Sequence, residues 1–240
     1  MSPNLSVLEA GTELWRCHET AFSCTAFNPV AAHSHFGGSR FDGTADDPYA
    51  YLYAAREPTT ALAEVLLRDM AFTWPAGTRQ VPWAKAAIRS LSKLRLTEDL
   101  LLVDLVTEED LAAVFQDAWL LETDGPGYAQ TRAWAREIRR QVPRAQGLRW
   151  QSRRHRPHHA VVLFGDRCGA EPLKAVPGHA HNLGTFEGAG EANRLLAPLR
   201  AVIVPPGMRM PPPRAARRPP RGAGSPRRPG PGPRRRRPPG

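Results

Sequence analysis

The positive charge of this chain is concentrated at its C-terminal end, and this limits the part that can fold. The chain has 240 residues and a formal net charge of +10. Residues 211–240 contain ten Arg, eleven Pro and five Gly but no acidic residue, so residues 1–210 carry equal numbers of basic and acidic side chains. A segment with so few apolar side chains does not bury enough surface to offset the entropy of ordering. We therefore expect residues 207–240 to form a disordered Arg/Pro-rich tail and residues 1–206 to fold as one domain.

Composition and termini indicate a cytoplasmic protein. The N-terminus lacks a basic start and a continuous apolar stretch, and no later segment approaches the roughly 20 apolar residues of a membrane span. The cysteines Cys17, Cys24 and Cys168 form no CxxC pair, so we expect reduced thiols. Short histidine pairs such as His33 and His35 lack an accompanying Cys or an HExxH arrangement. We expect neither a metal site nor a membrane partner.

Short apolar runs mixed with helical patterns favour an α+β fold. Alternating or clustered apolar residues predict strands at residues 13–17, 49–54, 100–105, 148–152, 160–165 and 200–204. Amphipathic spacing and capping signals predict helices at residues 58–69, 107–115, 128–141 and 187–199. The two kinds of segment do not alternate strictly, which argues against a doubly wound parallel sheet. Residues 22–49, rich in Gly, Asp, Asn and His, are expected to form a loop that positions polar groups.

Several short motifs follow one another along the chain. Residues 37–43 read GGSRFDG and residues 51–66 read YLYAAREPTTALAEVL; they are followed by TRAWAREI at 131–138, GLRWQSRRH at 147–155, AVVLFGD at 160–166 and RAVIVPP at 200–206. In this order the motifs resemble the RES domain, a family of bacterial toxins named for its Arg, Glu and Ser. The resemblance covers about residues 13–206 and assigns the family's functional positions to Arg40, Tyr53, Glu64 and Ser152. Tyr53 is preferred to Tyr51 because it keeps the family's spacing between Tyr and Glu.

The resemblance implies an enzyme that consumes NAD+ and resembles ADP-ribosyltransferases, with a central mixed or split sheet flanked by helices. Breaking the bond between nicotinamide and ribose leaves positive charge on the ribose carbon, as in glycoside hydrolysis. Glu64 is expected to stabilise that charge, hold a ribose hydroxyl or orient the nucleophile. Arg40 suits the pyrophosphate, with Arg16 as a second such contact. Tyr53 is expected to pack against nicotinamide, and Ser152 to hydrogen-bond the amide or ribose. No cofactor is expected beyond NAD+ as substrate.

The resemblance also implies a biological setting. Cleavage of NAD+, with water or inorganic phosphate as the acceptor, would deplete the cofactor and arrest growth. A cognate antitoxin with an Xre-like helix-turn-helix portion is expected to neutralise the enzyme by covering its cleft.

Other interpretations stay open at the level of the sequence. The same residues fit transfer of ADP-ribose to a protein, so the acceptor can be water, phosphate or protein. A further alternative is a nucleic-acid-binding protein with an inactive RES-like domain, which acts through non-specific contact of the basic tail with phosphates. The tail has no aromatic side chains on which bases could stack, which argues against sequence-specific recognition. Without the resemblance, a Glu on an amphipathic helix is usually a solvated residue and a Ser at a strand end usually caps a turn. Ser152 lacks the GxSxG turn of an α/β-hydrolase nucleophile, which argues against a serine hydrolase.

Overall fold

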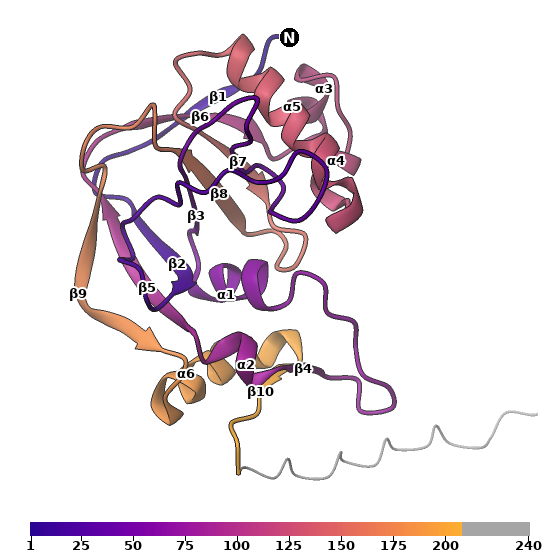
Figure 1. Ribbon diagram of the computed structural model, residues 1–240, viewed down its shortest axis with the longest axis vertical. Helices are drawn as coiled ribbons and strands as arrows, with labels where there is room; N and C mark the ends of the chain where they lie inside the picture. Colours follow the sequence, from indigo (N-terminus) through magenta and orange to yellow (C-terminus); the bar gives the residue numbers. More distant parts are fainter. Residues whose placement is uncertain (208–240) are drawn as a thin grey trace, which may run out of the picture. The chain divides into compact units, whose positions relative to one another are not determined.

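The structure, a computed structural model, describes residues 1–207 and confirms the α+β class (Figure 1). Its main feature is an eight-stranded sheet with the order β1-β6-β7-β8-β3-β2-β5-β9. The strands are β1 (Leu5–Leu8), β2 (Glu13–Glu19), β3 (Tyr51–Ala55), β5 (Arg89–Leu96), β6 (Leu100–Leu105), β7 (Gly147–Gln151), β8 (His159–Phe164) and β9 (Leu173–Asn182). The β6–β7 pair is parallel and its neighbours in the sheet pair antiparallel, so the sheet is mixed. Strands β4 (Arg79–Val81) and β10 (Ala201–Ile203) form a separate parallel pair.

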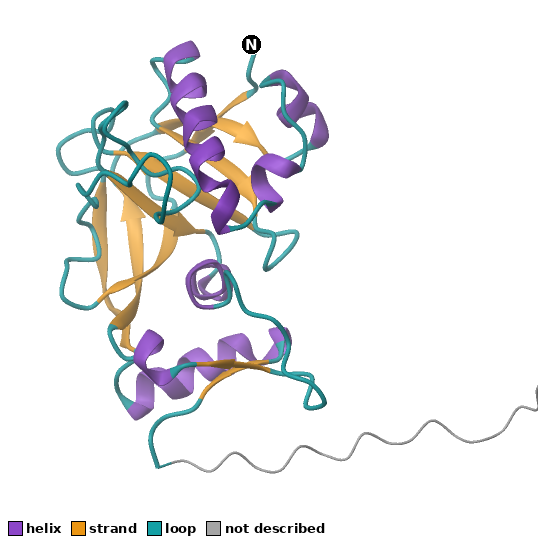
Figure 2. Ribbon diagram, turned by 45° about the vertical axis from the view of Figure 1, so that its right-hand side comes forward, coloured by secondary structure: helices purple, strands orange, loops and turns teal. Residues whose placement is uncertain are grey.

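Helices flank this curled sheet (Figure 2). They are α1 (Pro58–Leu66), α2 (Trp83–Ala86), α3 (Glu108–Ala113), α4 (Trp119–Glu122), α5 (Tyr128–Gln141) and α6 (Phe186–Leu196), with short 3-10 turns at Gly125–Gly127 and Ala197–Leu199. Helix α3 packs on β6, whereas α1 packs on β2 and β3 and also contacts α6. Among the described residues, no helix is long and apolar enough to cross a membrane.

Side chains of the sheet alternate between two apolar cores, one on each face. In β3, Tyr53 and Ala55 contact one core, whereas Leu52 and Ala54 belong to the other. The first core also contains buried apolar residues of α1, such as Leu62, and of α5, such as Ile138, and we call it the helix-side core. The second is built from strand residues such as Leu14, and we call it the strand-side core. Neighbouring residues of a strand therefore contribute to different cores, and every second residue contributes to the same one.

Helix α1 forms where its sequence predicts it. Pro58 occupies the first turn, where its missing N–H costs no intrahelical hydrogen bond. The helix then buries Ala61, Leu62 and Leu66 against the helix-side core. It ends at Leu66, three residues before the predicted end at residue 69. This small face is enough to fix the orientation of Glu64, which lies between the buried residues on the same helix.

The structure confirms the six predicted strands and the four predicted helices as elements, with shifts of one to three residues at most ends. Residues 22–49 contain turns and isolated bridges but no named helix or strand, as expected for a loop. Six further elements have no clear pattern in the sequence and were not predicted: β1, β4, β5, β9, α2 and α4. The predicted tail at residues 207–240 lies outside the described residues, apart from Gly207.

Candidate active site

Glu64 and Ser152 meet although 88 positions separate them in the chain. The Ser152 hydroxyl donates a hydrogen bond of 2.6 Å to Glu64 Oε1, and Ser152 is fully buried. Its Oγ also accepts from the backbone N–H groups of Arg154 (3.3 Å) and His155 (3.1 Å). One turn earlier on α1, Thr60 hydrogen-bonds His155 Nδ1 at 2.8 Å. The loop after β7 is thus attached to α1 at two points, and the half-buried Glu64 carboxylate is held from one side.

The register of the sheet explains why Ser152 reaches this place. Val162 of β8 lies opposite Tyr53 of β3 and opposite Leu148 of β7, so these three residues form one row across the sheet. Leu148 and Trp150 both belong to the helix-side core. Because side chains alternate along a strand, Ser152 continues on the same face just past the end of β7. The same face carries Tyr53.

Arg40 lies buried in the loop before β3. Its Nη2 donates to the Thr123 carbonyl at 3.3 Å, and its guanidinium lies 5.4 Å from the ring centre of Tyr128. Its Nε is buried and has no hydrogen-bond partner within residues 1–207. Burial lowers the pKa of Arg40, while the nearby Tyr128 hydroxyl and Glu64 carboxylate act in the opposite direction. Arg40 and Glu64 therefore lie within electrostatic reach of each other.

Tyr53 supports the loop that carries Arg40. Its hydroxyl donates to Asp42 Oδ1 at 2.8 Å and accepts from the Phe41 N–H at 2.9 Å. Burial and the adjacent Asp42 carboxylate raise the pKa of Tyr53 well above its usual value, so the hydroxyl stays protonated. The ring packs edge-on against Trp150 with centroids 6.1 Å apart. The structure thus brings Tyr53 to the site, and the predicted stacking on nicotinamide stays a prediction.

Asp42 also belongs to this group. It lies in the GGSRFDG motif, but no role was predicted for it from the sequence. It is 4% exposed, and its Oδ2 accepts from the Ser39 N–H at 2.7 Å while Oδ1 accepts from Tyr53. Burial raises the pKa of Asp42 above its ordinary value. The signal in the sequence was an acidic residue two positions after Arg40 in a Gly-rich segment. Its carboxylate fixes both the loop and the Tyr53 hydroxyl.

Two further features fix the backbone of the loop that carries Arg40. The Arg132 guanidinium on α5 donates to the carbonyls of His33 (2.8 Å), Gly37 (2.9 Å) and Ser39 (3.2 Å). At Gly43, a Cβ atom would lie 2.3 Å from the Tyr49 carbonyl oxygen, so no residue with a side chain fits there without movement. The loop that presents Arg40 is therefore held by side-chain contacts rather than by regular secondary structure.

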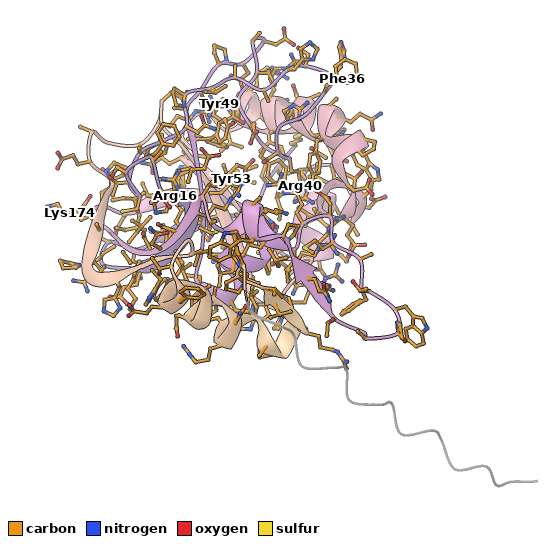
Figure 3. The ribbon with its side chains drawn as sticks, turned by 60° about the horizontal axis from the view of Figure 1, so that its bottom comes forward. Arg16, Phe36, Arg40, Tyr49, Tyr53 and Lys174 are labelled. Atoms are coloured by element: carbon orange, nitrogen blue, oxygen red, sulfur yellow. The ribbon has the colours of Figure 1, made fainter. Side chains whose placement is uncertain are left out.

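Arg16 does not join this group. It alternates with Trp15, which lies opposite Ala55, so its side chain is on the strand-side face and not on the face of Tyr53. Figure 3 labels Arg16 together with Arg40 and Tyr53. There its Nη1 donates to the carbonyls of Cys24 (2.7 Å) and Ala26 (2.6 Å). Burial lowers the pKa of Arg16 to about 10. In this structure Arg16 holds the start of the loop at residues 22–49.

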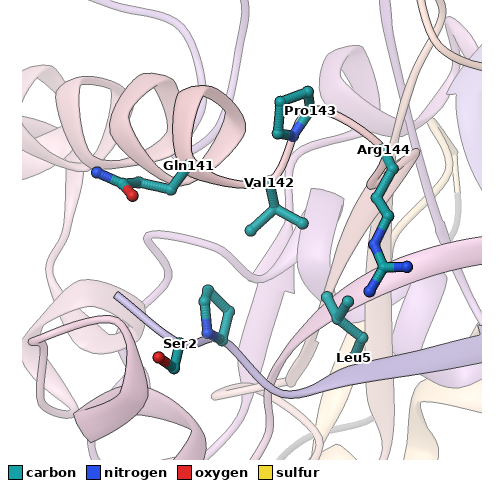
Figure 4. A pocket seen from close by; sticks show the side chains of 7 residues that line it. Ser2, Leu5, Gln141, Val142, Pro143 and Arg144 are labelled. Carbon is teal, nitrogen blue, oxygen red and sulfur yellow. The ribbon is translucent and has the colours of Figure 1, made fainter.

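Two cavities lie away from the group around Glu64. One has a volume of about 490 Å³ and lies between the N-terminal segment and the end of α5 (Figure 4); it is lined by Ser2, Pro3, Leu5, Gln141, Val142, Pro143 and Arg144. Another, of about 330 Å³, is lined by Thr25, Phe27 and residues 170–175. Neither includes a residue of the group around Glu64. Within residues 1–207, no group of three or more His, Cys, Asp or Glu side chains is placed to hold a metal ion.

The order of the motifs along the chain agrees with the comparison with known families. A family model described as RES domain matches residues 13–183. The chain belongs to the RES domain family. This confirms the resemblance, and the RES match spans Arg40, Tyr53, Glu64 and Ser152.

No curated protein matches the chain significantly. Among solved structures, this RES protein is similar to a chain in the crystal structure of the M. tuberculosis MbcT-MbcA toxin-antitoxin complex. The sequence identity is 14%, the TM-score is 0.49, and the match covers 72% of this chain and 85% of that chain.

Proposed function

We propose that this RES protein is a toxin that cleaves the nicotinamide–ribose bond of NAD+. Two observations support the proposal. The chain belongs to the RES family, and its structure joins Glu64 to Ser152 by a hydrogen bond of 2.6 Å on the face that also carries Tyr53. That contact carries the proposal, because a carboxylate held in a fixed direction is what the reaction needs.

The reaction breaks the bond between the ribose carbon and the ring nitrogen of nicotinamide. The bonding electron pair leaves with nicotinamide, and positive charge develops on the ribose carbon. The Glu64 carboxylate, kept in place by the buried Ser152 hydroxyl, would stabilise this charge without reorganising during the step. Water or inorganic phosphate then adds to the ribose carbon and loses a proton, which gives ADP-ribose or its phosphorylated form.

The remaining residues would bind and orient the substrate. The Arg40 guanidinium offers a planar set of donors to the phosphates of NAD+, and its Nε has no protein partner within the described residues. Tyr53 and Asp42 hold the loop that presents Arg40. Ser152 acts in this scheme through Glu64 rather than through direct contact with the nicotinamide amide. No metal and no further cofactor takes part in the proposed chemistry.

The proposed biological role follows from the family. Depletion of NAD+ would arrest growth of the producing cell, so a cognate antitoxin with an Xre-like helix-turn-helix portion would accompany the enzyme and cover the site. Co-expression of the chain with its neighbouring gene product tests this part, with restored growth as the expected result. Unchanged growth arrest with every neighbouring product would argue against an antitoxin of this kind.

The enzyme assay measures NAD+ loss by HPLC with purified full-length protein, with and without phosphate. Glu64→Gln should abolish cleavage while the fold stays intact, because it removes the charge and keeps the shape. Glu109→Gln is the matched control. Glu109 is an exposed glutamate on α3, and no hydrogen bond within residues 1–207 joins its side chain to Ser152. Phosphate-dependent formation of a phosphorylated product would name phosphate as the acceptor. Loss of NAD+ with release of neither ADP-ribose nor its phosphorylated form would indicate transfer to protein. A fully active E64Q variant, or no cleavage by the folded, antitoxin-free parent, would overturn the proposal.

A further inference from the structure

Arginine side chains gather beside Glu64 from three separate segments. Arg40 comes from the loop before β3, Arg68 follows α1, and Arg153 and Arg154 follow β7. We call these four residues the arginine cluster. Arg40 and Arg153 share the Thr123 carbonyl as an acceptor, at 3.3 and 3.2 Å. Arg153 and Arg154 share the Arg68 carbonyl, with the Arg153 contact at 3.2 Å. Shared acceptors bring the guanidinium groups close together.

The cluster carries more positive charge than its surroundings balance. Within residues 1–207, none of its four members forms a salt bridge, and their acceptors are uncharged backbone carbonyls. Burial lowers the pKa of Arg154, and the charge of Arg153 adds to this decrease, while Asp69 and Glu64 oppose it. Like charges packed this closely disfavour the folded state unless an anion balances them.

Several donors of the cluster are unused in the described part of the chain. Arg40 Nε and Arg154 Nε are buried and have no hydrogen-bond partner there. The Arg68 guanidinium donates no hydrogen bond to residues 1–207, and lies 5.9 Å from the ring centre of Tyr128, the same ring that Arg40 approaches to 5.4 Å. Guanidinium donors match the oxygen atoms of phosphate groups in geometry and charge. Unused donors at one place thus indicate a ligand with phosphoryl oxygens.

We propose that the arginine cluster is a binding site for phosphoryl oxygens, in which Arg68, Arg153 and Arg154 extend the contact made by Arg40. The identity of the ligand rests on the proposed function: it is the diphosphate of NAD+, whose ribose would then lie near Glu64. The presence of an anion site does not rest on it. Arg153 and Arg154 also hold the ends of α1 and α4 through backbone carbonyls, whereas Arg68 has no such structural role and is the cleaner probe.

Isothermal titration of the full chain with ADP-ribose, pyrophosphate and inorganic phosphate tests the proposal. Arg68→Gln removes one charge and leaves the hydrogen bonds of the described residues intact. It should weaken ADP-ribose binding about tenfold or more, in line with loss of a charge-assisted contact. Arg154→Gln should do the same. Arg140→Gln is the control with equal charge loss, because Arg140 is exposed and, within residues 1–207, pairs only with its helix neighbour Glu137. Thermal melting checks that each variant is folded.

Comparing the three ligands distinguishes a failure of this inference from a failure of the proposed function. Equal ADP-ribose affinity in the parent, R68Q and R154Q would overturn the cluster as a phosphate site, while NAD+ cleavage could still be measured. Pyrophosphate binding that R68Q abolishes, with no binding of ADP-ribose, would support the anion site and count against NAD+ as its source. Binding of inorganic phosphate alone, lost in R68Q, would assign the cluster to free phosphate and count against the diphosphate of NAD+ as its ligand. A parent that binds none of the three ligands would overturn the inference.

Discussion

Replacing Ser152 by alanine tests whether the Glu64 carboxylate depends on its buried hydrogen bond. Ser152 is fully buried, and its hydroxyl is the donor to Glu64 Oε1 and the acceptor for two backbone N–H groups. Alanine removes all three contacts and leaves a space of about one oxygen atom. Glu64 is half-buried, so it loses a protein donor that water replaces only in part.

The expected cost follows from the kinds of hydrogen bond that are lost. A hydrogen bond to a charged group contributes about 1.5–3 kcal/mol, and each bond between neutral groups about 0.5–1.5 kcal/mol. The two N–H contacts are long, at 3.1 and 3.3 Å, and lie in a partly exposed turn. We therefore expect Ser152→Ala to lower the free energy of unfolding by about 2–4 kcal/mol. In a domain of this size that corresponds to a decrease in Tm of about 5–15 °C.

Stability and activity are measured on the same preparations. Urea denaturation gives the free energy of unfolding, and NAD+ loss followed by HPLC gives the rate. Below the melting temperature, S152A should cleave NAD+ about 10 to 100 times more slowly, because a freely rotating carboxylate is no longer preorganised. Ser90→Ala is the control: Ser90 is also buried, but its hydroxyl makes one neutral contact, to Thr20 at 2.9 Å. It should cost about 1 kcal/mol and leave the rate unchanged.

A double-mutant cycle decides whether the two residues act together. The cycle compares S152A, Glu64→Ala and the double variant in urea denaturation. Residues in direct contact should show a coupling energy of about 1 kcal/mol or more. If the two losses in stability add to within about 0.5 kcal/mol, the hydrogen bond makes no net contribution and the reasoning fails. S152A with parental activity would refute the role of Ser152 in positioning Glu64.

Three further predictions concern other parts of the fold. Tyr53→Phe removes one hydrogen-bond donor from the buried Asp42 carboxylate. It should lower the free energy of unfolding, measured by urea denaturation, by about 2–3 kcal/mol. An unchanged urea midpoint would contradict the hydrogen bonds described. Burial raises the pKa of the Cys17 and Cys168 thiols to about 12. In a Cys24→Ser variant, neither thiol should therefore react with a disulfide reagent at pH 8 until the protein unfolds. Rapid labelling of the folded variant would contradict this. Hydrogen bonds from Arg95 and Lys93 lower the pKa of the partly exposed Glu13 carboxyl to about 2. Its stabilising effect should therefore be complete above its ordinary pKa of 4.5 and vanish as the pH falls through 2. Carboxyl NMR should show that midpoint, and a midpoint near 4.5 would refute the ion pairs.

The sequence predicts those elements whose apolar pattern is uninterrupted. Helix α1 and strand β8 were found because their buried residues are almost all apolar. Strand β5 was missed because it places Ser90 and Ser92 at buried positions, where they hydrogen-bond Thr20 and His18 instead of packing as apolar side chains. Strand β9 was missed because it is an edge strand, mostly exposed, and contains Pro and Gly. In both cases long-range pairing with a neighbouring strand overrides a weak local pattern.

The candidate site shows the same limit at the level of single residues. Motif spacing places Tyr53 on a strand and Glu64 on the helix that follows it, and the structure has β3 leading into α1. It could not show which face of the sheet α1 covers, because that depends on packing against residues far along the chain. Arg16 was therefore expected beside Arg40 as a second contact for the pyrophosphate, although its position in β2 places its side chain on the face opposite to that of Tyr53. A functional assignment of an arginine in this family needs its face as well as its motif, and by that criterion Arg68, which no motif singled out, is a stronger candidate for substrate contact than Arg16.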